Sequence, residues 1–219
     1  MAADPDYISQ DSFYVVIKDY EQETCFILML WALSILSYKG LATRRQNALL
    51  EQDLLQLPDG LPIGIEDTRT LVDRLHNRPS IEQNFLLPRV LLTGIERFSA
   101  TRNVQDVSTA VRDVCQSEGD RLESELSIIR YIAWAIPSVG FIGTVRGIGD
   151  ALGQAHRAVA GDITGVTENL GVAFNSTFVA LVISIILMFF IHQLQLQQER
   201  LILDSEQYAD HWLIRKLRG

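Results

Sequence analysis

The stretch Leu170–Ile191, LGVAFNSTFVALVISIILMFFI, determines what kind of protein this chain forms. Its 22 residues carry no charge. As a helix the stretch would extend about 33 Å, since each helical residue adds ~1.5 Å. The hydrocarbon core of a bilayer is about 30 Å thick. The sequence therefore predicts a transmembrane helix over 170–191.

Two further segments are apolar enough to cross a membrane. Thr24–Tyr38 is uncharged, and so is Tyr131–Val145, which is bounded by Arg130 and Arg146. Both are shorter than the ~20 residues of a usual span, and each alone is also compatible with a buried core helix. Aromatic residues typical of membrane interfaces favour spans at 24–38 and 130–149. These residues are Trp31, Tyr38, Tyr131 and Trp134.

The charges around the first predicted span set the expected orientation. One cation, Lys18, and six acids precede this span, whereas Lys39, Arg44 and Arg45 directly follow it. Because cytoplasmic loops carry the excess of Lys and Arg, we expect the N-terminus outside and the C-terminus in the cytoplasm. The parts outside the spans are then an extracytoplasmic segment 1–23, a cytoplasmic helical region 39–129, an extracytoplasmic loop 150–169 and a cytoplasmic amphipathic tail 192–219.

Helical spacing of apolar residues predicts the fold of the cytoplasmic parts. Helices are expected at Gln46–Leu57, Thr68–His76, Asn84–Ser99 and Val104–Arg130, with a break at Pro58–Pro62. The helix from Val104 runs on towards the second span, and the tail extends the third span as an amphipathic helix. We expect these two extensions to pack together. The predicted fold class is an all-α membrane protein with three transmembrane helices and long cytoplasmic helical extensions.

Composition argues against several other classes of protein. The net charge of −8 argues against a nucleic-acid-binding protein. The predicted topology separates Cys25 from Cys115, so a disulfide is not expected. The sequence has no cluster with metal-ligand spacing and no set of nucleophile, base and orienting group. We therefore predict neither an enzyme nor a bound cofactor.

Small and hydroxyl-bearing residues recur on one face of each of the last two predicted spans. On the third span they are Ala173, Thr177, Ala180 and Ser184. On the second span they are Gly140, Thr144 and Gly147, and Gly143 with Gly147 has the G-x-x-x-G spacing of close helix contacts. The two faces predict a contact between these helices.

Two interpretations of this contact stay open. Small residues often mark only tight helix packing, with Ser and Thr bonded to a carbonyl one turn back. Polar groups at membrane depth also mark ion paths, but none of the three spans has an acid in its interior. A conducting complex would take its carboxylate from another subunit. Arg146 is expected to be an outer gate or an anchor, with Asp150 one turn away or an anionic lipid headgroup as its partner.

Two motifs, GFIGTVRGIG at Gly140–Gly149 and AFNSTFVAL at Ala173–Leu181, carry a family resemblance. Together they resemble the MotA/TolQ/ExbB proton-channel family, most closely its three-span TolQ/ExbB branch. Thr144 and Thr177 fall on the threonines of the family motifs. Pro137 falls on the proline ahead of the first motif.

The resemblance implies a ring-forming subunit, commonly in five copies, of an ion-driven motor or channel in the bacterial inner membrane. Single-span partners similar to ExbD, TolR or MotB would sit inside the ring, each bringing a membrane aspartate. Protons, or sodium ions, would cross between Thr144, Thr177 and that aspartate, along a path that also includes Ala173, Ala180 and Ser184. Gly140, Gly143 and Gly147 would pack the helices. The alternative function is a non-conducting membrane scaffold.

Overall fold

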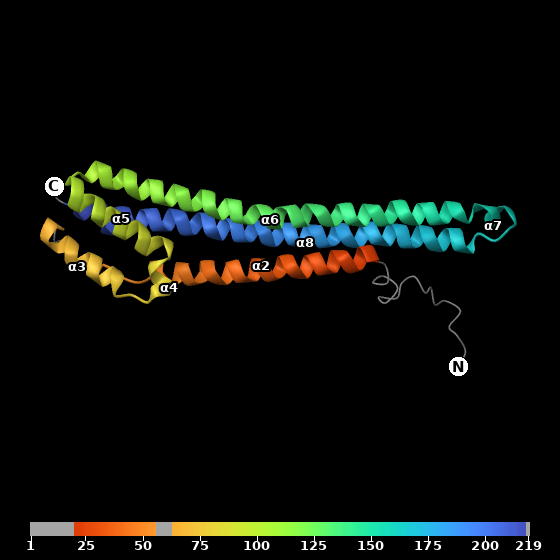
Figure 1. Cartoon of the computed structure of the whole chain (residues 1–219), viewed down its shortest axis with the longest axis horizontal. Helices are drawn as coiled ribbons and strands as arrows, with labels where there is room; N and C mark the ends of the chain where they lie inside the picture. Colours follow the sequence, from red (N-terminus) through yellow and green to blue (C-terminus); the bar gives the residue numbers. More distant parts are fainter. Residues whose placement is uncertain (1–19, 56–62, 218–219) are drawn as a thin grey trace, which may run out of the picture. The chain divides into compact units, whose positions relative to one another are not determined.

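The computed structural model describes residues 20–55 and 63–217, which are almost entirely helical (Figure 1). The elements are α2 (Tyr20–Leu50), α3 (Ile65–His76), α4 (Ser80–Gln83), α5 (Leu86–Thr101), α6 (Val104–Gly153), α7 (Ala155–Val159), α8 (Thr164–Trp212) and the 3-10 helix η2 (Ile214–Lys216). Residues 1–19 of the predicted segment 1–23 lie outside the described residues. The whole of the predicted break at Pro58–Pro62 lies outside them as well.

Extended pairing is confined, within the described ranges, to one isolated parallel bridge between Ile63 and Leu217. The backbone N–H of Ile63 donates to the carbonyl of Lys216 at 2.7 Å. The bridge ties the chain just before α3 to the end of the chain after η2. The predicted all-α class is confirmed.

The long helices join segments that the sequence presented separately. α6 runs without interruption from Val104 through the second predicted span, as expected. α8 likewise continues from the third predicted span to Trp212. The helix predicted at Gln46–Leu57 is confirmed for residues 46–50, which belong to α2 (Tyr20–Leu50), and is wrong for 51–55, which are not helical. No proline interrupts 24–50, and its Ala, Leu, Arg and Gln residues favour a helix, so the first span simply continues.

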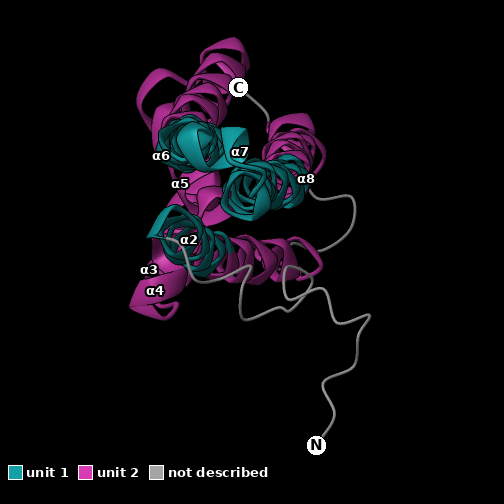
Figure 2. Ribbon diagram, turned by 90° about the vertical axis from the view of Figure 1, so that its right-hand side faces the viewer, with its two compact units in different colours: residues 1–36, 127–192 teal, residues 37–126, 193–219 magenta. Residues whose placement is uncertain are grey.

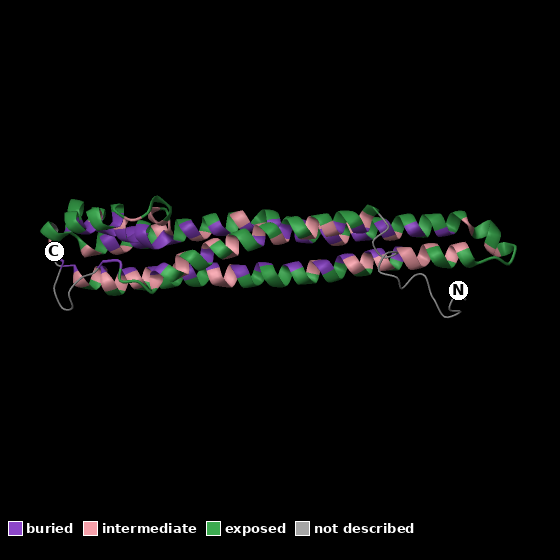
Figure 3. Ribbon diagram, turned by 90° about the horizontal axis from the view of Figure 1, so that it is seen from below, coloured by how far each residue is buried: buried purple, intermediate pink, exposed green. Residues whose placement is uncertain are grey.

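Within residues 20–55 and 63–217, three helices, beginning at Tyr20, Val104 and Thr164, are long and apolar enough to cross a membrane. Only 17%, 33% and 28% of their most apolar windows is buried within the chain. Exposed residues cover much of these helices in Figure 3. Many of the exposed side chains are large and apolar, among them Trp31, Phe141, Ile142, Phe174, Phe178 and Ile185. Such surfaces require lipid or another protein chain around them.

The chain divides into two compact units (Figure 2). Unit 1 consists of Met1–Leu36 and Ser127–His192, and unit 2 of Ser37–Leu126 and Gln193–Gly219. Unit 1 therefore holds α7 and the most apolar stretches of α2, α6 and α8. Unit 2 holds α3, α4, α5, η2 and the remaining lengths of the three long helices.

Unit 2 has its own apolar core, to which α3, α5, α6 and α8 contribute. Phe98 of α5 is fully buried, as is Leu213 just after α8. Gly94 allows a close approach here, since an added Cβ would lie 2.8 Å from the Leu213 side chain. Val111 of α6 and Leu201 of α8 belong to the same core. The predicted packing of the two helical extensions is thereby confirmed.

A chain of ion pairs links α5, α6 and α2 in unit 2. Arg89 and Arg121 contact the Glu118 carboxylate at 3.1 and 2.6 Å. Arg121 also pairs with Glu125, which lies 2.5 Å from Lys39. Burial by itself raises the pKa of Glu118, but the hydrogen bond and charge of Arg121, with the charge of Arg89, outweigh it and lower that pKa overall. Glu118 is therefore a buried carboxylate held in its charged form.

Candidate ion path

The contact between α6 and α8 in unit 1 is built from very small side chains. A Cβ added at Gly140 would collide with the Cβ of Ala180 and lie 3.1 Å from the Ser176 carbonyl. A Cβ at Gly147 would lie 2.7 Å from the Cβ of Ala173. Gly140 meets Ala180, and Gly147, which is later in α6, meets Ala173, which is earlier in α8, so the two helices pack antiparallel. Their backbones lie closer together than larger residues would permit.

We define the seam as the two facing rows of this contact. It contains Gly140, Gly143, Thr144 and Gly147 of α6 and Ala173, Ser176, Thr177, Ala180 and Ser184 of α8. The structure thus brings together the two faces predicted from residue spacing. It adds Ser176 to them, which is buried and only 2% exposed. A Cβ at Gly143 would collide with the Ser176 hydroxyl.

Thr144 and Thr177 cross the seam in both directions. The Thr144 hydroxyl donates to the Ala173 carbonyl at 2.9 Å, and the Thr177 hydroxyl donates to the Gly140 carbonyl at 3.0 Å. The two hydroxyl oxygens also contact each other. Each threonine therefore reaches the backbone of the opposite helix and the hydroxyl of the opposite threonine.

These contacts need more protons than the hydroxyls carry. Each hydroxyl has one proton to donate and two lone pairs that accept. Two protons thus serve three contacts, those to Ala173, to Gly140 and between the oxygens. When both protons point to the carbonyls, the Thr144 and Thr177 oxygens face each other with lone pairs only. That arrangement accepts a proton or a small cation.

Ser184 has a different place in the seam. Pro137 lies inside α6 and has no N–H, so the helix leaves the carbonyl of Ala133, four residues earlier, without its usual donor. The Ser184 hydroxyl donates to that carbonyl at 2.8 Å. Satisfying such a freed carbonyl from a neighbouring helix is what permits a proline within an apolar span.

α2 lies against the same part of α6. The Cys25 thiol contacts the Ile136 carbonyl at 3.6 Å, and Cys25 is buried. Nearer the start of α2, the Glu21 carboxylate lies 2.9 Å from the Arg146 guanidinium. Glu21 Oε2 is buried and has no hydrogen-bond partner. Its contact with Arg146 is therefore an ion pair in which no N–H points directly at the oxygen.

Residue spacing did not single out Glu21. The predicted partner of Arg146 was Asp150, which the structure leaves exposed one turn further along α6. The signal for Glu21 in the sequence is weak: an acid just before one apolar segment and an arginine at the end of another. Only the packing of α2 against α6 shows that these two charges meet.

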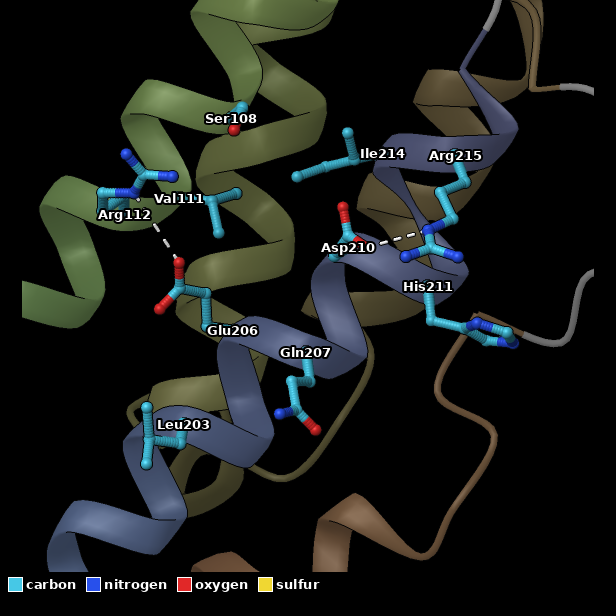
Figure 4. Close-up of a pocket in the computed structure, with 10 residues that line it drawn as sticks. All are labelled: Ser108, Val111, Arg112, Leu203, Glu206, Gln207, Asp210, His211, Ile214 and Arg215. Carbon is cyan, nitrogen blue, oxygen red and sulfur yellow. Dashed lines mark hydrogen bonds and ion pairs between the residues drawn. The ribbon is translucent and has the colours of Figure 1, made fainter.

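Unit 2 contains a polar cleft of about 740 Å³ (Figure 4). Its charged side chains are already engaged, since Arg112 pairs with Glu206 at 3.7 Å and Arg215 with Asp210 at 2.8 Å. Figure 4 shows these pairs at the wall of the cleft, beside the α8 residues Leu203, Gln207 and His211. The two arginines and two acids balance, so these four side chains give the cleft no net charge.

Comparison with known proteins identifies the family of this chain. The model of the MotA/TolQ/ExbB proton channel family matches residues 82–207, more than half of the chain. The matched region contains the whole seam and both threonines. No curated protein and no solved structure matches the chain. With three helices able to cross a membrane and this family match, the chain is a multi-pass membrane protein that belongs to the MotA/TolQ/ExbB proton channel family.

Proposed function

We propose that this chain is the ring-forming subunit of an ion-driven motor or channel, and that its seam forms part of the ion path. The observation that carries the proposal is the Thr144–Thr177 hydroxyl pair, which has two protons for three contacts. A hydroxyl that alternates between a carbonyl and a facing hydroxyl passes a proton on without a large movement. Ala173 and Ala180 pack against Gly147 and Gly140 on either side of the pair, and Ser184 lies two turns further along α8.

The path needs a titratable group that this chain does not supply. Residues 24–38, 130–149 and 170–191 include no acid. A proton path at membrane depth usually depends on a carboxylate or histidine. We therefore propose a single-span partner similar to ExbD, TolR or MotB that places an aspartate beside Thr144 and Thr177. The transported ion is H⁺, with Na⁺ as the variant, and its flow drives movement of the ring relative to the partner.

The proposed assembly is a homopentamer of the three-span TolQ/ExbB type in the bacterial inner membrane. The number of apolar helices and the large apolar side chains left exposed on unit 1 support it. The excess of Lys and Arg after the first span supports an N-terminus outside and a C-terminus in the cytoplasm. The spans at 24–38, 130–149 and 170–191 then separate a cytoplasmic region 39–129 and tail 192–219 from the outer loop 150–169. The proposed role involves no catalysis and no resident cofactor.

A non-conducting membrane scaffold is the second candidate, and one observation favours it. Every hydroxyl of the seam reaches a carbonyl of the opposite helix, as the contacts of Thr144, Ser176, Thr177 and Ser184 show. Such contacts hold helices together without any ion. The scaffold differs from the channel in that it needs no aspartate-bearing partner.

Co-expression with the products of neighbouring reading frames separates the two candidates. The complex is extracted in detergent and its native mass is measured. A ring of this chain that holds a smaller number of single-span, aspartate-bearing chains supports the motor. A ring of this chain alone, with no such partner retained, contradicts the motor and favours the scaffold.

A further inference from the structure

The ion pair between Glu21 and Arg146 lies at one end of the seam. Glu21 Oε2 is 2.9 Å from Arg146 Nη2, and the side chains are 13% and 42% exposed. Gly143 makes room for this approach, because a Cβ there would lie 3.5 Å from the Glu21 Cβ. The same added Cβ would collide with the Ser176 hydroxyl. Glu21 and the seam therefore meet around Gly143.

The pair lies close to the two threonine hydroxyls along the axis of α6. Arg146 follows Thr144 by two residues, which is about 3 Å of helix rise. It lies on the side of Thr144 where α6 leads through α7 to α8. An ion that enters or leaves the seam at this end therefore comes within about 3 Å of the level of the pair along the axis of α6.

The charges of this pair have opposite effects on a cation. A guanidinium stays protonated in proteins, and an arginine that lines a pore repels cations. The Glu21 carboxylate supplies the compensating negative charge. Its Oε2 is buried beside Arg146 and has no aligned hydrogen bond, so Glu21 acts on a passing cation through its charge.

We propose that Glu21 and Arg146 form a charge-balanced mouth of the ion path, in which Glu21 cancels the barrier that Arg146 would otherwise impose on a cation. This inference rests on the proposed function, because it assumes that the seam conducts. It assigns an ion-path role to a residue of the first apolar helix, outside the two helices that form the seam. Glu21 acts here by charge, so its effect depends on whether Arg146 is present.

A cysteine reporter measures the charge of the mouth without any need for conduction. Gly149 lies one turn beyond Arg146, and an added Cβ there meets nothing within 4 Å, so Gly149→Cys gives an accessible thiol. The native thiols Cys25 and Cys115 are 1% and 2% exposed, and the protein without the reporter gives their background. The rate of modification by an anionic methanethiosulfonate is divided by the rate with a cationic one.

The charge balance predicts how this ratio changes. Glu21→Gln should raise the ratio at least threefold, Arg146→Gln should lower it at least threefold, and the double variant should return it to within twofold of the parent. Gly40→Cys is the matched control, because Gly40 also has open space and lies nineteen residues after Glu21 in α2. Its ratio should not respond. If neither Glu21→Gln nor Arg146→Gln changes the ratio measured at Gly149→Cys, the proposal is contradicted.

Ion flux in liposomes that contain the chain and its partner then tests the consequence for conduction. Glu21→Gln should reduce the flux at least fivefold, and adding Arg146→Gln should restore it to within twofold of the wild type. Undiminished flux in Glu21→Gln overturns the proposal, and so does a double variant that stays as impaired as the single one. Absence of flux in the wild type instead contradicts the proposed function, and the reporter ratio still decides whether the pair sets the charge of this surface.

Discussion

Ser184 of α8 donates a hydrogen bond to the carbonyl of Ala133 in α6, the one carbonyl from which Pro137 removes the usual helical donor. The proline and the serine are 47 residues apart in the sequence, and the serine supplies the hydrogen-bond donor that the proline removes. Without the hydroxyl, an unsatisfied carbonyl would remain in an apolar helix contact, which is costly in lipid. The polar groups of the seam therefore include one whose contact is structural.

Replacement of Ser184 should destabilise unit 1. Ser184→Ala removes the donor to Ala133 and should lower the free energy of unfolding by about 1 kcal/mol. Ser138→Ala is the matched control, because the Ser138 hydroxyl is exposed and bonds weakly within its own helix, to Trp134 at 3.4 Å. Thermal unfolding in detergent measures both variants. Equal transition temperatures would show that the Ala133 carbonyl does not depend on Ser184.

Enlargement of Gly140 should loosen the seam. The Cβ of Gly140→Ala collides with the Ala180 Cβ, so the helices must separate, at a cost of roughly 1–3 kcal/mol. Gly149→Ala, also in α6, meets nothing within 4 Å and should leave stability unchanged or raised by up to about 1 kcal/mol. Thermal unfolding compares the two variants. A Gly140→Ala protein as stable as Gly149→Ala would contradict the close approach of α6 and α8 at Gly140.

Much of the fold follows from patterns that are local in the sequence. The uncharged stretch 170–191 predicted the apolar part of α8, and the spacing from Val104 to Arg130 predicted that α6 continues into the second span. The spacing of Gly140, Thr144 and Gly147 predicted a face that the structure does bring against Ala173 and Thr177. Helical periodicity is enough for these predictions because it fixes which residues share a face.

Other features depend on which helices meet, and spacing does not specify that. The contact of Glu21 with Arg146 and the support of Ala133 by Ser184 both join different helices. The pairing of Arg89 with Glu118 is of the same kind, since α5 must first pack on α6. The sequence predicted that this helix stops at Pro58, whereas α2 ends at Leu50, where no Gly or Pro follows directly to mark the end.

The buried carboxylate of Glu118 should make unit 2 sensitive to acid. Because Arg121 and Arg89 lower the pKa of Glu118 in the folded state, its contribution is complete above the unfolded-state pKa of about 4.3. That contribution is lost as the pH falls through the lower, folded-state pKa. Glu118→Gln should lose about 2 kcal/mol of stability at pH 7 and show a weaker dependence on acid.

Urea unfolding followed by tryptophan fluorescence checks this expectation, with Trp212 as the reporter in unit 2. Glu96→Gln serves as the control, because Glu96 is an exposed acid of α5. The control should unfold like the parent at every pH. If Glu118→Gln keeps the full acid dependence of the parent, the ion pairs of Glu118 are not its origin.

Cys115 should be unreactive while unit 2 is folded. Burial, with a smaller contribution from the charges of Glu206 and Glu118, raises the pKa of its thiol to about 11. At pH 8 about one thiol in a thousand is then a thiolate, the reactive form. Alkylation by iodoacetamide at pH 8 should require denaturant. Rapid alkylation of the folded protein at Cys115, located by peptide mass spectrometry, would contradict the buried site.

Thr177→Val probes the proposed role of the Thr144–Thr177 hydroxyl pair in the ion path. The substitution removes the hydroxyl at nearly constant volume, whereas Thr177→Ser keeps it. Thr167→Val is the matched control on α8, since the exposed Thr167 hydroxyl bonds only to the local carbonyls of Ile163 and Thr164.

The measurement is proton flux into liposomes that contain the chain and its single-span partner at matched, mass-verified assembly. Thr177→Val should abolish the flux, Thr177→Ser should retain a substantial part of it and Thr167→Val should conduct like the wild type. Wild-type flux in a correctly assembled Thr177→Val complex would show that the hydroxyl pair is not part of the ion path.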